Sequence, residues 1–184
     1  MENEKSWVLQ IKKNGSETAA NNLVAKYYKE MYAFMYKQTL DQELALDLTQ
    51  EIFISVLISI HNYDPKKASF RTWLYKLASN RLVDYFRSKS YKHTQIAKPI
   101  EDYDFEDDHD MTISLEYKDD VERASALINE LDASSQQIVR LKLFADYTFQ
   151  EIAEIETIPQ STVKTKYYTA LKRIRKGMEK VHDE

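Results

Sequence analysis

Apolar side chains recur along most of the chain with the spacing of an α-helix rather than that of a β-strand. The stretches with this spacing cover residues 16–39, 41–60, 70–90 and 120–184. Only 2 glycines and 3 prolines punctuate them, too few for a protein rich in hairpins. The pattern therefore predicts an all-α fold built from long helices.

A connector without sustained periodicity separates the helical stretches. Residues 96–119 contain few large aliphatic side chains and exceed the usual length of a loop within a domain. We therefore expect two small helical domains, residues 1–95 and 120–184, joined by a flexible acidic linker.

The distribution of charge along the chain sharpens this division. The formal net charge is only −4, but residues 66–98 carry +8, residues 99–120 carry −9 and residues 160–180 carry +6. Two basic blocks flank an acidic connector, and such clustering is typical of chains that bind nucleic acid.

Composition excludes several classes of protein. With 43% apolar residues and no cysteine, the chain predicts a globular protein without disulfides or thiolate metal sites, which suits the cytoplasm. The first residues lack the pattern of a signal peptide, and the apolar run 52–60 is too short to span a bilayer, so membrane insertion is not expected. Four scattered histidines and the lack of a glycine-rich phosphate loop disfavour an enzyme, a metal site or a cofactor.

The C-terminal region contains the pattern of a helix-turn-helix. Thr148 and Glu151 have the spacing of a capping box, and residues 156–159 interrupt the helical pattern before a second helix begins. One face of this second helix is apolar. The other face is polar and basic and presents Ser161, Lys164, Thr165, Tyr168 and Lys172. Such a face can contact bases and phosphates in a major groove, although two packed helices with a soluble outer face would fit the same pattern.

The helix over residues 41–60 has a second, partly apolar face. Asp47, Gln50, Glu51 and Ile54 lie off the main apolar stripe. Apolar residues outside a core need covering, so this face predicts a partner surface. A helix wholly buried in a bundle is the alternative.

The following helix carries a polar stripe. Lys76, Asn80 and Arg87 share one side of it, with Trp73 at the border. Cations, an amide and an aromatic ring are the groups that hold unpaired DNA. The alternative is a solvated helix face with Trp73 in the core.

Three segments together resemble the extracytoplasmic-function group of bacterial sigma factors. They are DLTQEIFISVLISI, FRTWLYKLASNRLVDYFR, and the region from LINELDASSQQIV to ALKRIRK. The resemblance implies a factor without catalysis of its own that directs core RNA polymerase to promoter DNA and assists melting in transcription initiation. It also allows an anti-sigma factor as a further partner.

The resemblance also implies roles for the candidate residues. Asp47, Gln50, Glu51 and Ile54 fall where the family binds core polymerase. Residues 61–69 and the stripe with Trp73, Lys76, Asn80 and Arg87 fall where the family reads the melted −10 element. The helix-turn-helix face falls where it reads the −35 element.

A standalone helix-turn-helix regulator, with an N-terminal bundle that senses a signal or dimerises, is the competing interpretation. Thr157 and Ser161 stand where the family usually has glycine, and a β-branched residue in left-handed geometry is costly.

Overall fold

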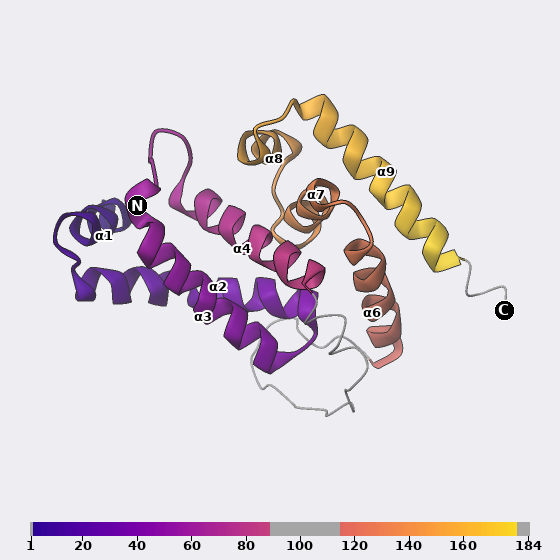
Figure 1. Ribbon diagram of the computed structural model, residues 1–184, viewed down its shortest axis with the longest axis horizontal. Coiled ribbons are helices and arrows are strands. Elements are labelled where there is room, and N and C mark those ends of the chain that lie inside the picture. Colours follow the sequence, from indigo (N-terminus) through magenta and orange to yellow (C-terminus); the bar gives the residue numbers. More distant parts are fainter. Residues whose placement is uncertain (1, 89–114, 180–184) are drawn as a thin grey trace.

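The computed structural model describes residues 2–88 and 115–179, and all regular structure within these ranges is helical. Two helical groups follow each other along the chain (Figure 1). The N-terminal bundle comprises α1 (Glu2–Asn14), α2 (Glu17–Thr39), α3 (Gln42–Ser59), the short 3-10 helix η1 (Ile60–Asn62) and α4 (Phe70–Arg87). The C-terminal bundle comprises α6 (Leu115–Asn129), α7 (Ala133–Phe144), α8 (Phe149–Glu156) and α9 (Gln160–Glu179). The predicted all-α fold is confirmed.

Two boundaries differ from the sequence prediction. Helix α1 was not anticipated, although Trp7, Val8 and Ile11 have helical spacing and the last two are buried. Helix α6 begins at residue 115, inside the expected linker 96–119. The rest of that linker lies outside the described residues.

Side-chain caps fix the starts of the helices. Ser16, Asp41, Ser69 and Asp132 each accept a hydrogen bond from the backbone N–H three residues ahead, at 3.1 to 3.3 Å. Such caps satisfy backbone donors that the helix leaves without an internal partner. Because each cap follows a turn, the caps set where one helix stops and the next one starts.

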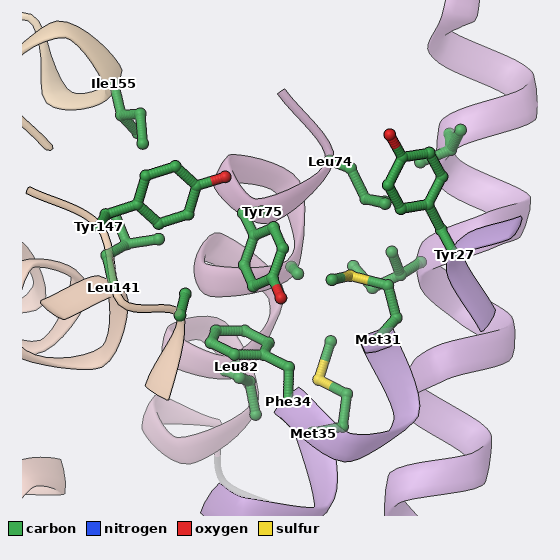
Figure 2. Packing of buried hydrophobic residues seen from close by; sticks show 14 of the residues in the cluster. Tyr27, Met31, Phe34, Met35, Leu74, Tyr75, Leu82, Leu141, Tyr147 and Ile155 are labelled. Atoms are coloured by element: carbon green, nitrogen blue, oxygen red, sulfur yellow. The ribbon is translucent and has the colours of Figure 1, made fainter. Parts of the chain in front are cut away.

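The cores of the two bundles are continuous. Buried side chains of α2 and α4 lie next to Leu141, Tyr147 and Ile155 of the C-terminal bundle (Figure 2). Tyr75 of α4 packs edge-on against Tyr147, with ring centres 5.4 Å apart. The two bundles therefore contact each other directly, in an arrangement that we call closed.

A close approach fixes α9 within the C-terminal bundle. A Cβ atom added at Gly177 would lie 2.5 Å from a methyl carbon of Leu127 in α6. A larger residue at this position would displace the Leu127 side chain, so glycine allows the end of α9 to lie close against α6.

The turn between α8 and α9 contains the strained residue expected from the sequence. Thr157 has φ 58° and ψ 42°, the left-handed conformation, and its N–H bonds the carbonyl of Ala153. The N–H of Ile158 bonds the same carbonyl at 3.1 Å. These bonds close the end of α8, so the threonine adopts the geometry that glycine usually provides.

Replacing Thr157 with glycine should raise the free energy of unfolding by about 0.5–1 kcal/mol. The substitution relieves left-handed strain of roughly 1–2 kcal/mol, partly offset by the greater freedom of glycine in the unfolded chain. Urea unfolding followed by circular dichroism measures the change. Thr169→Gly, in the exposed middle of α9, is the matched control and should lower stability by a few tenths of a kcal/mol. Equal losses in both variants would contradict the assignment of strain to Thr157.

Candidate nucleic-acid interface

The polar face of α9 is exposed, as the sequence predicts. All five residues predicted to form this face are exposed: Ser161, Lys164, Thr165, Tyr168 and Lys172. Tyr168 is the aromatic residue among them. Val163, Tyr167 and Ala170 on the opposite face are buried against α6, α7 and α8. The helix therefore presents a continuous polar and basic surface to solvent.

Helix α8 orients this face. In its capping box, the Thr148 N–H donates to the Glu151 carboxylate at 2.8 Å, and the Glu151 N–H donates to the Thr148 hydroxyl at 3.2 Å. The bond from the Thr148 N–H, and a second from the Thr148 hydroxyl at 2.7 Å, hold the pKa of the Glu151 carboxyl below its usual value. Phe149, the first residue of α8, then packs on Tyr167 and Tyr168 with ring centres 5.2 and 6.0 Å away.

A cation near this face was missed by the sequence analysis. The Lys142 ammonium of α7 lies 5.5 Å from the centre of the Phe149 ring. It adds positive charge beside the polar face of α9, and the spacing along α9 could not predict it because Lys142 belongs to a different helix.

The outer face of α3 is a second exposed surface. Asp47, Gln50 and Ile54 are exposed, with Ile54 at 58%. Ile58, one turn further, reaches 77%, and Leu46 at the other end is 38% exposed. At 100° per residue these positions fall within about 140° of the helix circumference, opposite the buried face.

Glu51 differs from its neighbours on this face. Its carboxylate accepts a hydrogen bond from Arg81 Nε of α4 at 2.6 Å. The side chain is still 48% exposed. Glu51 therefore borders the α3 face and is oriented by α4.

By length and composition, Gln42–Asn62 is apolar enough to cross a membrane. One side of it, however, packs in the N-terminal bundle through Leu48, Ile52 and Val56, each at most 2% exposed. The hydropathy of this segment is high because α3 is apolar on two faces, one in the core and one exposed at Leu46, Ile54 and Ile58. An exposed apolar face is typical of a partner surface.

The four residues of the α4 stripe occupy different environments. Arg87 is exposed at the end of α4. Trp73 is half-buried beside Tyr63 and Phe70, with ring centres 5.3 and 5.8 Å away. The ring thus belongs partly to the core. Its remaining surface is exposed beside the loop between α3 and α4.

Lys76 and Asn80, the centre of the stripe, contact the C-terminal bundle. The Lys76 ammonium donates to the backbone carbonyl of Ile155 at 2.5 Å, at the end of α8. The Gln137 amide of α7 donates to Asn80 Oδ1. In the closed arrangement both groups bond protein and are half-buried, so the stripe that the sequence predicts is partly covered at its centre.

Arg140 of α7 is the most buried cation of the contact between the bundles. Its side chain is fully buried and donates to Gln38 Oε1 of α2 at 2.7 Å. The guanidinium carbon lies 4.7 Å from the centre of the Phe86 ring of α4. Arg140 therefore links α7 to two helices of the N-terminal bundle.

Further polar groups line the contact. Arg71 of α4 lies 5.2 Å from the centre of the Tyr147 ring and donates to Glu30 of α2 at 2.7 Å. Burial raises the pKa of the Glu156 carboxyl, at the end of α8, although the nearby Lys76 opposes this. Helical spacing in a single sequence does not predict which residues far apart in the chain pair with one another. Within the described residues, no cluster of acidic residues and histidines could hold a metal ion.

Comparisons with known protein families match both bundles. Residues 23–91 match the model described as Sigma-70 region 2, and residues 122–174 match the model described as Sigma-70, region 4. The two matches together cover most of the chain, and α1 precedes the first of them.

Curated relatives extend over nearly the full length. The chain is 29% identical over 184 residues to the ECF RNA polymerase sigma factor SigW of Bacillus subtilis, covering 95% of this chain and 96% of that protein. It is 27% identical over 162 residues to SigX of the same organism, covering 86% and 82%. The ECF factor RpoE of Cereibacter sphaeroides is 24% identical, with 91% of each chain covered.

Solved structures share the fold. CnrH, in complex with the cytosolic domain of CnrY, superposes with a TM-score of 0.62 at 15% identity, covering 96% of this chain and 97% of that one. The sigma factor RpoE of Bartonella quintana, in complex with the anti-sigma factor NepR, gives 0.56 at 16% identity, covering 86% and 96%.

Proposed function

Because the chain belongs to the extracytoplasmic-function group of the sigma-70 family, and so directs RNA polymerase to promoters, we propose that its three surfaces bind three different targets. The outer face of α3 binds core polymerase, the α4 stripe binds the melted −10 element, and the exposed face of α9 binds the −35 element. Residues 1–95 and 120–184 act as two domains, each with its own DNA contact. The chain works in the cytoplasm and performs no catalysis of its own.

The exposed isoleucines support the assignment of α3 to core polymerase. Ile54 and Ile58 are 58% and 77% exposed and lie next to Asp47 and Gln50. An apolar centre with a polar rim is the usual composition of a protein interface. Glu51 reaches the edge of this surface while it is held by Arg81.

The exposed polar face supports the assignment of α9 to duplex DNA. Short hydroxyl side chains at Ser161 and Thr165 allow the helix to approach base edges, and Lys164 lies between them. Lys172, two turns further, is placed to contact a phosphate. Tyr168 adds a ring at the centre of the same surface.

The bonds of Lys76 and Asn80 to the C-terminal bundle are the observation that supports the proposed mechanism. In the closed arrangement both side chains bond the C-terminal bundle, so these bonds compete with unpaired DNA for the same polar groups. The two bundles therefore separate before the −10 element is read. The polymerase supplies the free energy for this step if it binds the separated bundles more tightly than the closed ones.

This mechanism also makes specific promoter binding depend on polymerase. A free factor in the closed arrangement offers only the α9 face to DNA, and it lacks the avidity of two simultaneous contacts. An anti-sigma factor, as NepR is for the Bartonella quintana RpoE, is a further partner that could bind this chain.

Ile54→Asp should weaken the binding of core polymerase by about 2 kcal/mol or more, because it places a charge at the centre of the proposed interface. Fluorescence titration of labelled factor with core enzyme measures the affinity. Leu9→Asp is the matched control, since Leu9 of α1 is 66% exposed and lies outside the proposed surface. If both variants bind core like the parent, the α3 face is not the interface.

Lys164→Ala should lower the affinity of holoenzyme for the −35 element by about 1–3 kcal/mol and relax specificity at one base pair. A gel-shift series over base-substituted −35 elements measures both effects. Lys172→Ala is the contrasting control and should weaken binding to every sequence equally, with a smaller salt dependence. A uniform loss with Lys164→Ala would identify Lys164 as a phosphate contact instead.

Locking the closed arrangement should abolish promoter opening. Lys37 of α2 and Ser125 of α6 line the same cavity of about 290 Å³ between the bundles, and the chain has no cysteine of its own. The double variant Lys37→Cys/Ser125→Cys can therefore be joined by a short thiol-reactive cross-linker that a reductant removes. Permanganate reactivity at the start site should disappear on cross-linking and return on reduction.

The single variant Lys37→Cys, treated with the same reagent, is the control and should open promoters throughout. Undiminished opening by the cross-linked double variant would contradict the need for the bundles to separate.

A further inference from the structure

Helix α1 lies outside the family match, which begins at residue 23, yet it contacts the loop that joins α3 to α4. The contact is made by Lys12. Its ammonium donates to the backbone carbonyl of Tyr63 at 2.5 Å and to that of His61 at 3.4 Å. It also lies 5.6 Å from the centre of the Tyr63 ring. Residues separated by about fifty positions are joined in this way.

These carbonyls lie where the helical segment of α3 and η1 ends. The last carbonyls of a helix receive no hydrogen bond from an N–H of the same helix, and they form the negative end of its dipole. A lysine that bonds them from another helix satisfies these groups and opposes the local negative charge. Lys12 thereby fixes the direction in which the chain leaves η1.

Tyr63 transmits this constraint to the rest of the loop. Its ring is 7% exposed and packs edge-on against Phe70, with ring centres 5.6 Å apart. Its hydroxyl donates to the carbonyl of Ala68 at 3.1 Å, which closes the loop on itself. The Trp73 ring packs against both rings, with ring centres 5.3 Å from Tyr63 and 5.8 Å from Phe70.

Further bonds within the loop give it a defined shape. The Lys66 N–H donates to Asp64 Oδ1 at 2.9 Å, and the Lys67 N–H donates to the Asp64 carbonyl at 3.1 Å. His61, Asn62 and Lys66 are exposed. The loop therefore presents polar groups to solvent on a framework that is anchored at Tyr63 and held from α1.

We propose that Lys12 is a positioning residue for −10 recognition. It holds the loop 61–69, and through Tyr63 the ring of Trp73, in the shape that receives unpaired bases. This proposal rests on the assignment of the loop and the α4 stripe to the −10 element. A residue that only stabilised the N-terminal bundle would affect all DNA equally, whereas a positioning residue affects the choice among base sequences.

The test compares two single-stranded oligonucleotides bound to holoenzyme, one with the promoter's −10 bases and one with those bases exchanged. The ratio of the two affinities is measured within one preparation, so a change in the folded fraction cancels. Lys12→Met keeps the apolar stem and removes the donor. The ratio should fall about fivefold to tenfold, somewhat less than the full loss of a hydrogen bond to a charged donor.

Two variants sharpen this result. Lys12→Arg, which keeps a charged donor, should restore most of the ratio. Lys13→Met, at the neighbouring exposed lysine of α1, should leave it unchanged. A ratio that stays at the parent value in Lys12→Met, or affinities that fall equally for both oligonucleotides, would overturn the proposal.

A spectroscopic readout reports the loop directly. The chain has 2 tryptophans, Trp7 and Trp73, so Trp7→Phe leaves Trp73 as the only one. Adding Lys12→Met to this background should increase the quenching of Trp73 fluorescence by acrylamide, because a loosened loop exposes the ring. Identical quenching with and without Lys12 would show that the lysine does not set the position of Trp73.

A final variant separates this proposal from the function on which it rests. Trp73→Ala should lower the affinity ratio if region 2 reads the −10 bases through this ring. If Trp73→Ala has no effect, the assignment of the −10 site is wrong. If Trp73→Ala lowers the ratio while Lys12→Met does not, only the role of Lys12 is wrong.

Discussion

The buried guanidinium of Arg140 is the interaction on which the closed arrangement depends. It donates to Gln38 of α2 and to Asn129 of α6, and it lies over the Phe86 ring of α4. Because Gln38 and Phe86 belong to the N-terminal bundle, these contacts of a buried cation specify how the two bundles fit together. When the bundles separate, Arg140 keeps Asn129 of its own bundle, and water replaces Gln38 and Phe86. Hydration of the guanidinium thereby recovers part of the free energy lost with these contacts. The contact between the bundles can therefore be specific and still reversible.

This arrangement sorts the functional surfaces into two groups. The α3 face and the α9 face stay exposed, whereas Lys76 and Asn80 bond α8 and α7. Under the proposed assignments, core polymerase and duplex DNA bind first, and unpaired DNA binds after the bundles separate. In the proposed mechanism, the carbonyl end of α8 and the phosphates of DNA compete for the Lys76 ammonium, so one side chain serves both closure and DNA binding.

The sequence predicted what depends on local periodicity and capping. The helices after α1, the capping box at Thr148 and the two exposed faces follow from spacing along one helix, and exposed Ile54 was anticipated in this way. The contact of Lys76 with Ile155 joins positions far apart in the chain, and one sequence carries no signal for such a pair. Arg140 was missed because a cation within an amphipathic helix ordinarily faces solvent. Thr157 was expected to be strained and is left-handed, because backbone bonds to Ala153 fix the turn.

The most direct test of this account is the distance between the two bundles in the free and the polymerase-bound factor. Spin labels at Gln10→Cys on α1 and Thr169→Cys on α9, both exposed, report it without interference because the chain has no other cysteine. The account predicts one narrow distance distribution for the free factor and a shift to longer distances when core polymerase is added. A distribution that stays unchanged in the holoenzyme would contradict the claim that the bundles separate to uncover the −10 site.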